Sequence, residues 1–101
     1  MNHEELILKC NDFLVSEGKI RKQVLTAMSS LLIPYDEEQP FVTEIPLDGY
    51  DRGVLEPPTI TELWKEGNFL YFMYKDCDTY SYVDDLSTTD LIRTYLSMLE
   101  F

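Results

Sequence analysis

The feature of this chain that most constrains its fold is the dipeptide Gly67-Asn68, which separates two segments of strand-like composition. Residues 59–66 and 69–75 are rich in β-branched and aromatic side chains, which favour extended structure. A two-residue loop with glycine in the first place is typical of a type II′ hairpin turn. Such a turn sets the register of the two strands. The expected opposite pairs are Glu66 with Phe69, Trp64 with Tyr71, and Leu63 with Phe72.

A second turn at Cys77-Asp78 would extend the hairpin into a meander, with Met73 opposite Tyr82 and Asp76 opposite Thr79. Successive side chains of a strand point to opposite faces, so the meander sorts its side chains into two sets. One set, the aromatic face, is expected to contain Trp64, Tyr71, Met73, Tyr80 and Tyr82. The other, the aliphatic face, is expected to contain Leu63, Leu70, Phe72, Tyr74 and Val83.

The central segment 69–75 is apolar on both faces, whereas an antiparallel sheet with one wet face alternates apolar and polar residues. We therefore expect both faces to be covered, either by helices on both sides or by a helix on one and a partner on the other. The aliphatic face is the better core candidate. The aromatic face suits the rim of the core or an interface, where tyrosine hydroxyls reach water.

Two amphipathic helices are expected before the sheet, over residues 2–16 and 19–32, because apolar side chains recur there at helical spacing. The stripe of the first consists of Leu6, Cys10, Phe13 and Leu14. The stripe of the second consists of Ile20, Val24, Ala27, Met28 and Leu31, widened by Leu25 and Leu32. Asn2 is expected to be the N-cap, with Glu5 as its capping-box partner. Gly18 is a natural helix stop, which favours a helical hairpin; one long bent helix is the alternative.

Residues 41–47 alternate between apolar and polar side chains, and Pro40 and Pro46 indicate a strand at a sheet edge. Residues 48–58 contain two glycines, two prolines and three acids, which predicts a loop. Long loops often carry function. This one would present Tyr50 and Arg52, two residue types favoured as interface anchors.

The C-terminal segment predicts a helix that begins at Ser87, a hydroxyl N-cap, with Asp90 in its first turn. Leu86 and Leu91 occupy the staple positions on either side of the cap. The expected inward stripe is Leu91, Tyr95, Met98 and Leu99. Residues 1–101 thus predict one α+β domain: an N-terminal helical hairpin, a three- to four-stranded antiparallel meander and a C-terminal helix.

The location expected for this chain is the cytoplasm. No apolar run approaches the roughly 20 residues needed to span a bilayer. The segment Met1–Glu5 is acidic and lacks the pattern of a signal peptide. Cys10 and Cys77 form no metal-binding or redox motif, so we expect two free thiols.

The net charge of −11 is unevenly distributed. Residues 1–33 contain four acids and four bases, so the remaining 15 acids and four bases account for all of the excess. Such a field repels phosphate, which argues against direct nucleic-acid binding. It either serves only solubility or favours basic partners.

No catalytic, cofactor or metal motif is present. The only histidine, His3, lies at the N-terminal end, where the fixed geometry of a general base is not expected. A calcium loop that started at Asp76 would need glycine and glutamate where Ser81 and Ser87 stand. Residues 48–53 contain glycines but no lysine and no following helix, so they are not a phosphate loop.

These observations favour a non-enzymatic protein-interaction module: an adaptor, an inhibitor or a regulatory subunit. The expected partner is another protein, for which a basic surface fits, or a second copy of the chain, with no membrane and no cofactor. The candidate partner-binding residues are Tyr50, Arg52, Trp64, Tyr71, Tyr80 and Tyr82. One alternative is an acidic mimic of nucleic acid that blocks a basic cleft. A second alternative is a small ligand-binding domain or enzyme with a cleft lined by Cys77 and Trp64.

Overall fold

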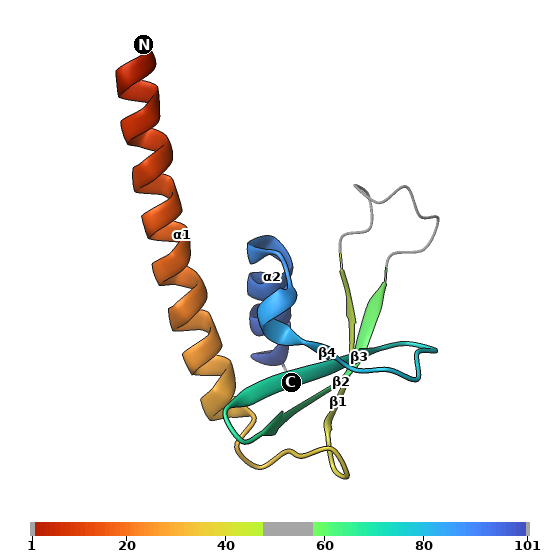
Figure 1. The fold of residues 1–101 in the computed structure, drawn as a ribbon. Coiled ribbons are helices and arrows are strands. Elements are labelled where there is room, and N and C mark those ends of the chain that lie inside the picture. The colour runs from red at the N-terminus through yellow and green to blue at the C-terminus, as the bar shows by residue number, and fades with distance from the viewer. Residues whose placement is uncertain (1, 48–57, 101) are drawn as a thin grey trace.

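The computed structural model describes residues 2–47 and 58–100 and shows an α+β chain (Figure 1). Its elements in order are α1 (His3–Leu31), β1 (Phe41–Pro46), β2 (Thr59–Glu66), β3 (Phe69–Tyr74), β4 (Ser81–Tyr82), the short 3-10 helix η2 (Val83–Asp85) and α2 (Thr88–Met98). The four strands form one antiparallel sheet in the order β1-β2-β3-β4. The expected fold class is therefore confirmed, with an N-terminal helix, an antiparallel sheet that includes an edge strand β1, and a C-terminal helix.

The β2–β3 hairpin has the register that its turn predicted. Glu66 pairs with Phe69, Trp64 with Tyr71, and Leu63 with Phe72. Gly67 has a φ of +62°, whereas Asn68 is not among the residues with positive φ. A positive φ at the first turn position alone distinguishes type II′ from type I′.

The register expected between β3 and β4 is wrong. Tyr82 pairs with Tyr71 rather than with Met73, and Ser81 pairs with Phe72. The cause lies in the connection, where Asp76 adopts a φ of +62° in a turn closed by a hydrogen bond from the Cys77 N–H to the Tyr74 carbonyl. Because the shift is by an even number of residues, every side chain keeps its expected face.

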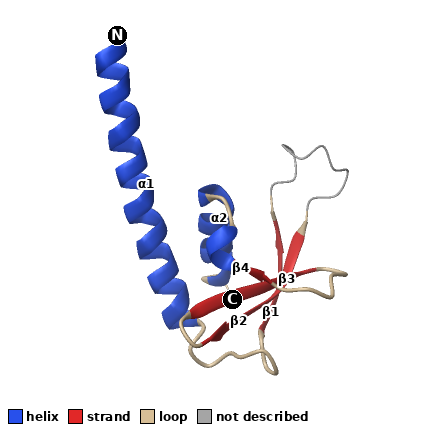
Figure 2. Cartoon of the chain, viewed as in Figure 1, coloured by secondary structure: helices blue, strands red, loops and turns tan. Residues whose placement is uncertain are grey.

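The two α-helices, α1 and α2, both pack on the aliphatic face of the sheet (Figure 2). The core combines buried residues from α1, α2, η2 and the sheet: Met28, Leu32, Ile45, Leu47, Ile60, Leu63, Leu70, Phe72, Val83, Leu86, Leu91 and Met98. Ile60 and Leu63 are both fully buried, although residues three apart on a regular strand face opposite ways. A register shift between Ile60 and Glu62 resolves this conflict and turns Ile60 into the core.

The expected N-terminal helical hairpin is wrong, because α1 is one helix of 29 residues that passes through Gly18. Glu17 and Arg21 both bond to the hydroxyl of Thr88, and residues at i and i+4 share a face only in a continuous helix. A glycine inside a helix costs about 1 kcal/mol relative to alanine, which such contacts offset. Asn2 is the N-cap, as expected, and accepts a hydrogen bond from the Glu5 N–H at 2.8 Å.

The N-terminal half of α1 projects beyond the rest of the molecule (Figure 1). The radius of gyration is 15.7 Å, whereas a compact chain of this length has about 13 Å. The stripe expected on this half is exposed rather than buried: Leu6, Phe13 and Leu14 keep 49%, 66% and 62% of their surface, and Cys10 is also exposed. We call this stretch, residues 3–16, the arm.

The start of α2 is as expected, since the Ser87 hydroxyl accepts a hydrogen bond from the Asp90 N–H at 3.2 Å. Leu91 and Met98 are buried on the inward stripe. Leu99 was also expected on this stripe but is half exposed, because the helix ends at Met98. Thr94 takes a buried place instead, with its hydroxyl donating to the Asp90 carbonyl.

Candidate functional site

The aromatic face lies opposite the aliphatic face, against which α1 and α2 pack (Figure 2). Its rings come from β2, β3, β4 and the segment just before β4, which the antiparallel order of the sheet brings side by side. Pairing of Trp64 with Tyr71 and of Tyr71 with Tyr82 sets their relative positions directly. Four of the six residues expected to bind a partner, Trp64, Tyr71, Tyr80 and Tyr82, are thus brought together.

The four rings form one contact network centred on Tyr71. The Trp64 and Tyr71 rings are stacked, with centroids 5.8 Å apart and an interplanar angle of 19°. Tyr80 meets Tyr71 edge to face at 5.1 Å, and Tyr82 lies 5.1 Å from Tyr71 at a tilt of 40°. Phe69 joins from the start of β3, 6.1 Å from Tyr82. Such offset and edge-to-face contacts stabilise aromatic pairs, so the cluster is a preorganised surface.

Exposure within the cluster is graded. Tyr80 and Phe69 each expose 55% of their surface and Tyr82 exposes 43%. Trp64 exposes only 2% and lies under Tyr71 and Tyr80, so it supports the cluster from below. A binding partner would therefore contact Phe69, Tyr80 and Tyr82 first.

Acidic groups border the aromatic face. Glu62 and Glu66 flank Trp64 at two-residue spacing on β2, which places them on its side of the sheet. Burial raises the pKa of Tyr71 above its ordinary value of 10.0, with further contributions from Tyr82, Glu66 and Tyr80. Glu66 thus places a negative charge near the Tyr71 ring.

The other two expected binding residues, Tyr50 and Arg52, lie outside the described residues. Cys77 is exposed in the turn after β3, whereas Trp64 is buried below the aromatic cluster. Neither side chain lines the α1–hairpin cleft or the small pocket beside the start of α2 that are described next.

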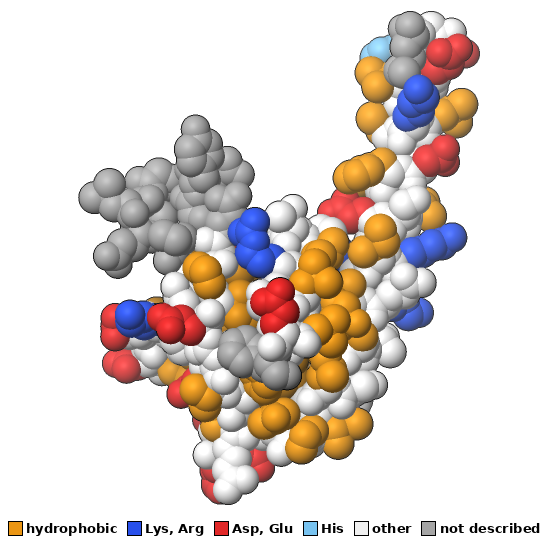
Figure 3. All heavy atoms as spheres, turned by 180° about the vertical axis from the view of Figure 1, so that it is seen from behind, with side chains coloured by type: hydrophobic (Ala, Val, Ile, Leu, Met, Phe, Trp, Pro, Cys, Tyr) orange, Lys and Arg blue, Asp and Glu red, His pale blue; other side chains and the backbone are white. Residues whose placement is uncertain are grey.

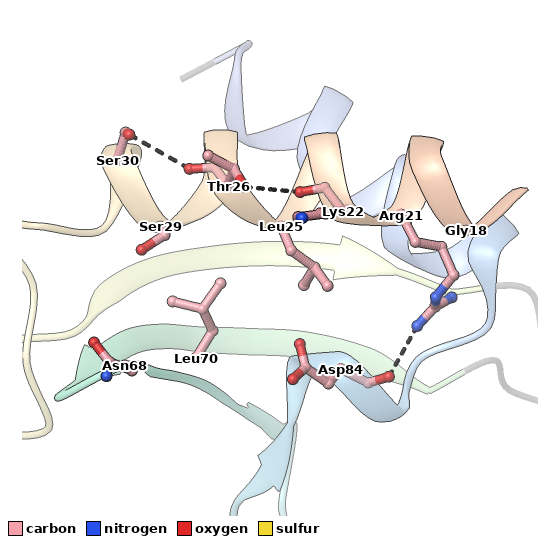
Figure 4. Close-up of a pocket in the computed structure, with 10 residues that line it drawn as sticks. All are labelled: Gly18, Arg21, Lys22, Leu25, Thr26, Ser29, Ser30, Asn68, Leu70 and Asp84. Atoms are coloured by element: carbon pink, nitrogen blue, oxygen red, sulfur yellow. Dashed lines mark hydrogen bonds between the residues drawn. The ribbon is translucent and has the colours of Figure 1, made fainter. Parts of the chain in front are cut away.

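An open cleft of about 600 Å³, with polar and apolar side chains in its lining, lies between the second half of α1 and the β2–β3 hairpin (Figure 4). Leu25 from α1 and Leu70 from β3 point toward each other across it. Three of its polar side chains are engaged within the chain: the Thr26 and Ser30 hydroxyls donate to carbonyls of their own helix, and Arg21 donates to the Asp84 carbonyl at 2.8 Å. The remaining polar side chains of its lining are those of Lys22, Ser29, Asn68 and Asp84.

The junction between α1 and α2 fixes the direction of the arm. Arg21 donates to the Thr88 hydroxyl at 3.1 Å, and that hydroxyl donates to the Glu17 carboxylate. Just beyond this junction, a small pocket lined mainly by apolar surface lies between α1 and the start of α2, and Phe13 and Ile20 form part of its wall. Figure 3 shows hydrophobic side chains extending from the body onto the projecting helix.

Comparisons with protein-family models, with curated proteins and with solved structures gave no match. In residues 2–47 and 58–100, no three or more His, Cys, Asp or Glu side chains are grouped so that they could hold a metal ion. Over the same residues, no helix combines the length and apolarity needed to cross a membrane.

Two features escaped the sequence reasoning. The junction of Glu17, Arg21 and Thr88 joins residues far apart in the chain, and nothing local marks it. The exposure of the arm also went unnoticed, although the seven-residue spacing of Leu6, Phe13 and Ile20 was a usable signal of one uninterrupted helix.

Proposed function

We propose that this protein is a non-enzymatic protein-interaction module, an adaptor, inhibitor or regulatory subunit, that binds its partner through the aromatic face. One observation carries the proposal: α1 and α2 both pack on the aliphatic face, while the opposite face presents a contiguous set of exposed rings. Tyrosine and other aromatic residues are enriched at protein interfaces because they bury large areas at low entropic cost.

The partner that fits this face is basic. Glu62 and Glu66 flank the rings, and residues 34–101 contain all of the excess negative charge. Acidic groups on the rim of an interface accelerate association with a positive partner more than they increase affinity. The proposal therefore includes an association rate that falls as salt is raised.

The place of the histidine supports this class of function over catalysis, and the state of the cysteines bears on the compartment. His3, the one histidine of the chain, lies in the first turn of α1 at the outer end of the arm. Cys10 and Cys77 are both free and exposed, which fits a reducing compartment and is the reason to include the cytoplasm in the proposal.

A comparative affinity capture from the native host tests the proposal. The baits are the tagged wild-type chain, a Tyr80→Ser/Tyr82→Ser variant, and a control variant Leu96→Ser. Leu96 lies on α2, away from the sheet, and its exposed fraction of 53% matches the 55% of Tyr80. We expect a protein that the wild type and the control retain and the double variant loses.

Binding by purified components then quantifies the effect. Loss of two anchoring aromatic side chains should weaken affinity by roughly 30-fold or more, since anchors typically cost at least 2 kcal/mol when truncated. Equal affinity for the double variant and the control would show that the aromatic face is not the binding surface.

A further inference from the structure

The arm carries a continuous apolar stripe that no described residue covers along most of its length. Leu6, Cys10, Phe13 and Leu14 recur every three or four residues, so they share one face of α1. All four are exposed. The same face continues into Val24 and Met28, which pack on the core. The arm therefore extends a core-forming surface into solvent.

The structure also limits what can cover this stripe. Thr88, the first residue of α2, bonds to Glu17 and Arg21, so α2 occupies the face of α1 only from about the level of Glu17 onward. The free part extends from Leu6 to Leu14 and is centred near Cys10. A partner helix of about two to three turns would fill it.

We propose that this occupant is the arm of a second copy, paired antiparallel about a twofold axis near Cys10. A twofold pair is isologous, so the stripe of each copy covers the stripe of the other. Leu6 of one copy then lies near Leu14 of its partner. This interface is separate from the aromatic face, and neither proposal depends on the other.

The exposed area suits a reversible dimer. Leu6, Phe13 and Leu14 expose between 49% and 66% of their surface, and Ile7 beside them exposes 48%. With Cys10, these side chains present on the order of 500 Å² per copy. Two copies would bury about 1,000 Å², which is close to the lower limit for a specific interface.

The charges of α1 select the antiparallel orientation. Glu4 and Glu5 lie in its first turn, whereas Arg21 donates to Thr88 at the start of α2, and the Glu17 carboxylate beside it accepts from the same hydroxyl. Antiparallel pairing brings the acidic turn of one copy toward the positive end of the α2 dipole of the other. Parallel pairing would place the two acidic turns side by side.

The acidic bodies favour the same orientation. Residues 34–101 contain the whole net charge of −11, so two bodies side by side would repel each other. In the antiparallel pair the two levels of Glu17 are about 20 Å apart along the helix axis. The Debye length at physiological salt is about 8 Å, so the repulsion between the bodies is largely screened.

Sedimentation equilibrium of the wild-type chain and of two single variants tests the interface. Phe13→Glu places a charge in the stripe, and Val15→Glu places the same charge on the opposite face of the same helix. The two side chains are similarly exposed, at 66% and 59%, so both variants should fold equally well, which circular dichroism checks. We expect dimers for the wild type and Val15→Glu, and a dissociation constant at least about 30-fold higher for Phe13→Glu.

Oxidative cross-linking tests the orientation. In a Cys77→Ser background, Cys10 should form a disulfide-linked dimer under copper–phenanthroline, because the axis brings the two Cys10 residues together. In a Cys10→Ser/Cys77→Ser background, an added Asn2→Cys should not cross-link, since an antiparallel pair separates these ends by about 24 Å. Cross-linking at position 2 would overturn the antiparallel arrangement. A monomeric wild type would overturn the interface, and so would an equal loss of dimer in Phe13→Glu and Val15→Glu. Substitutions on the aromatic face should leave the dimer intact.

Discussion

Arg21 joins the middle of α1 to the start of α2, so its replacement by lysine is a specific perturbation of the helix junction. Its guanidinium donates from Nη1 to the Thr88 hydroxyl at 3.1 Å and from Nη2 to the Asp84 carbonyl at 2.8 Å. A guanidinium presents these donors in a fixed planar fork, whereas lysine has one compact ammonium group. Lysine retains the charge but can reproduce at most one of the two contacts.

The expected magnitude follows from what is lost. A hydrogen bond that involves a charged group contributes roughly 1.5–3 kcal/mol when buried, and the half-buried position of Arg21 reduces this value. We expect Arg21→Lys to lower the free energy of unfolding by about 1 kcal/mol. For a domain of this size that corresponds to a fall in Tm of about 4–8 °C. Lys22→Arg, at the exposed neighbouring position, should stay within about 0.5 kcal/mol of the wild type.

Urea titration monitored by circular dichroism measures these differences, and a double-mutant cycle isolates the contact. Thr88→Val removes the shared hydroxyl at nearly constant volume. If Arg21 and Thr88 interact as the distances indicate, the double variant should be less destabilised than the two single changes combined, with a coupling of about 0.5–1 kcal/mol. Additive effects, or an Arg21→Lys variant as stable as Lys22→Arg, would refute the junction.

Three further changes have defined outcomes. Ser87→Ala removes the cap that accepts from the Asp90 N–H, so the free energy of unfolding should fall by about 1 kcal/mol; an unchanged urea midpoint would contradict the cap. Thr43→Val should raise stability by about 1 kcal/mol, because the buried Thr43 hydroxyl has no hydrogen-bond partner among the described residues, and a destabilised variant would reveal a partner. Burial raises the pKa of Tyr71, so the folded state favours the neutral phenol; the stability this contributes is complete below pH 10.0 and is lost as the pH rises through the folded-state pKa. Tyr71→Phe should therefore weaken the fall in stability at alkaline pH, measured as the urea midpoint against pH, and an unchanged dependence above pH 10.0 would count against it.

Local signals predicted the hairpin and the helix caps well. The glycine of Gly67-Asn68 supplies the positive φ that the turn requires, and that single turn determines the register of β2 on β3. Ser87 and Asn2 cap their helices through contacts only three residues away. In each case the residues that decide the structure are sequence neighbours, so a sequence pattern is sufficient.

The failures arose where distant contacts decided the outcome. Gly18 alone favours a helix stop, but the Thr88 hydroxyl accepts from Arg21 and donates to Glu17, and these two bonds on either side of Gly18 stabilise the continuous helix. The β3–β4 register depended on the positive φ of Asp76. Aspartate tolerates this conformation, but its presence in a sequence does not predict it. The aromatic face could be predicted because period-two alternation survives an even register shift. The choice of the aliphatic face as the core was also correct, because its side chains are the more apolar set.

Hydroxyl-radical footprinting of the wild-type chain, alone and with its captured partner, tests the central claim most directly. Phe69, Tyr80 and Tyr82 expose 43–55% of their surface in the isolated chain and should all be oxidised there. We expect the bound partner to protect these three side chains and to leave Leu96, which is equally exposed on α2, oxidised as before. Unchanged oxidation of the three rings in the complex would contradict the assignment of the aromatic face as the binding surface.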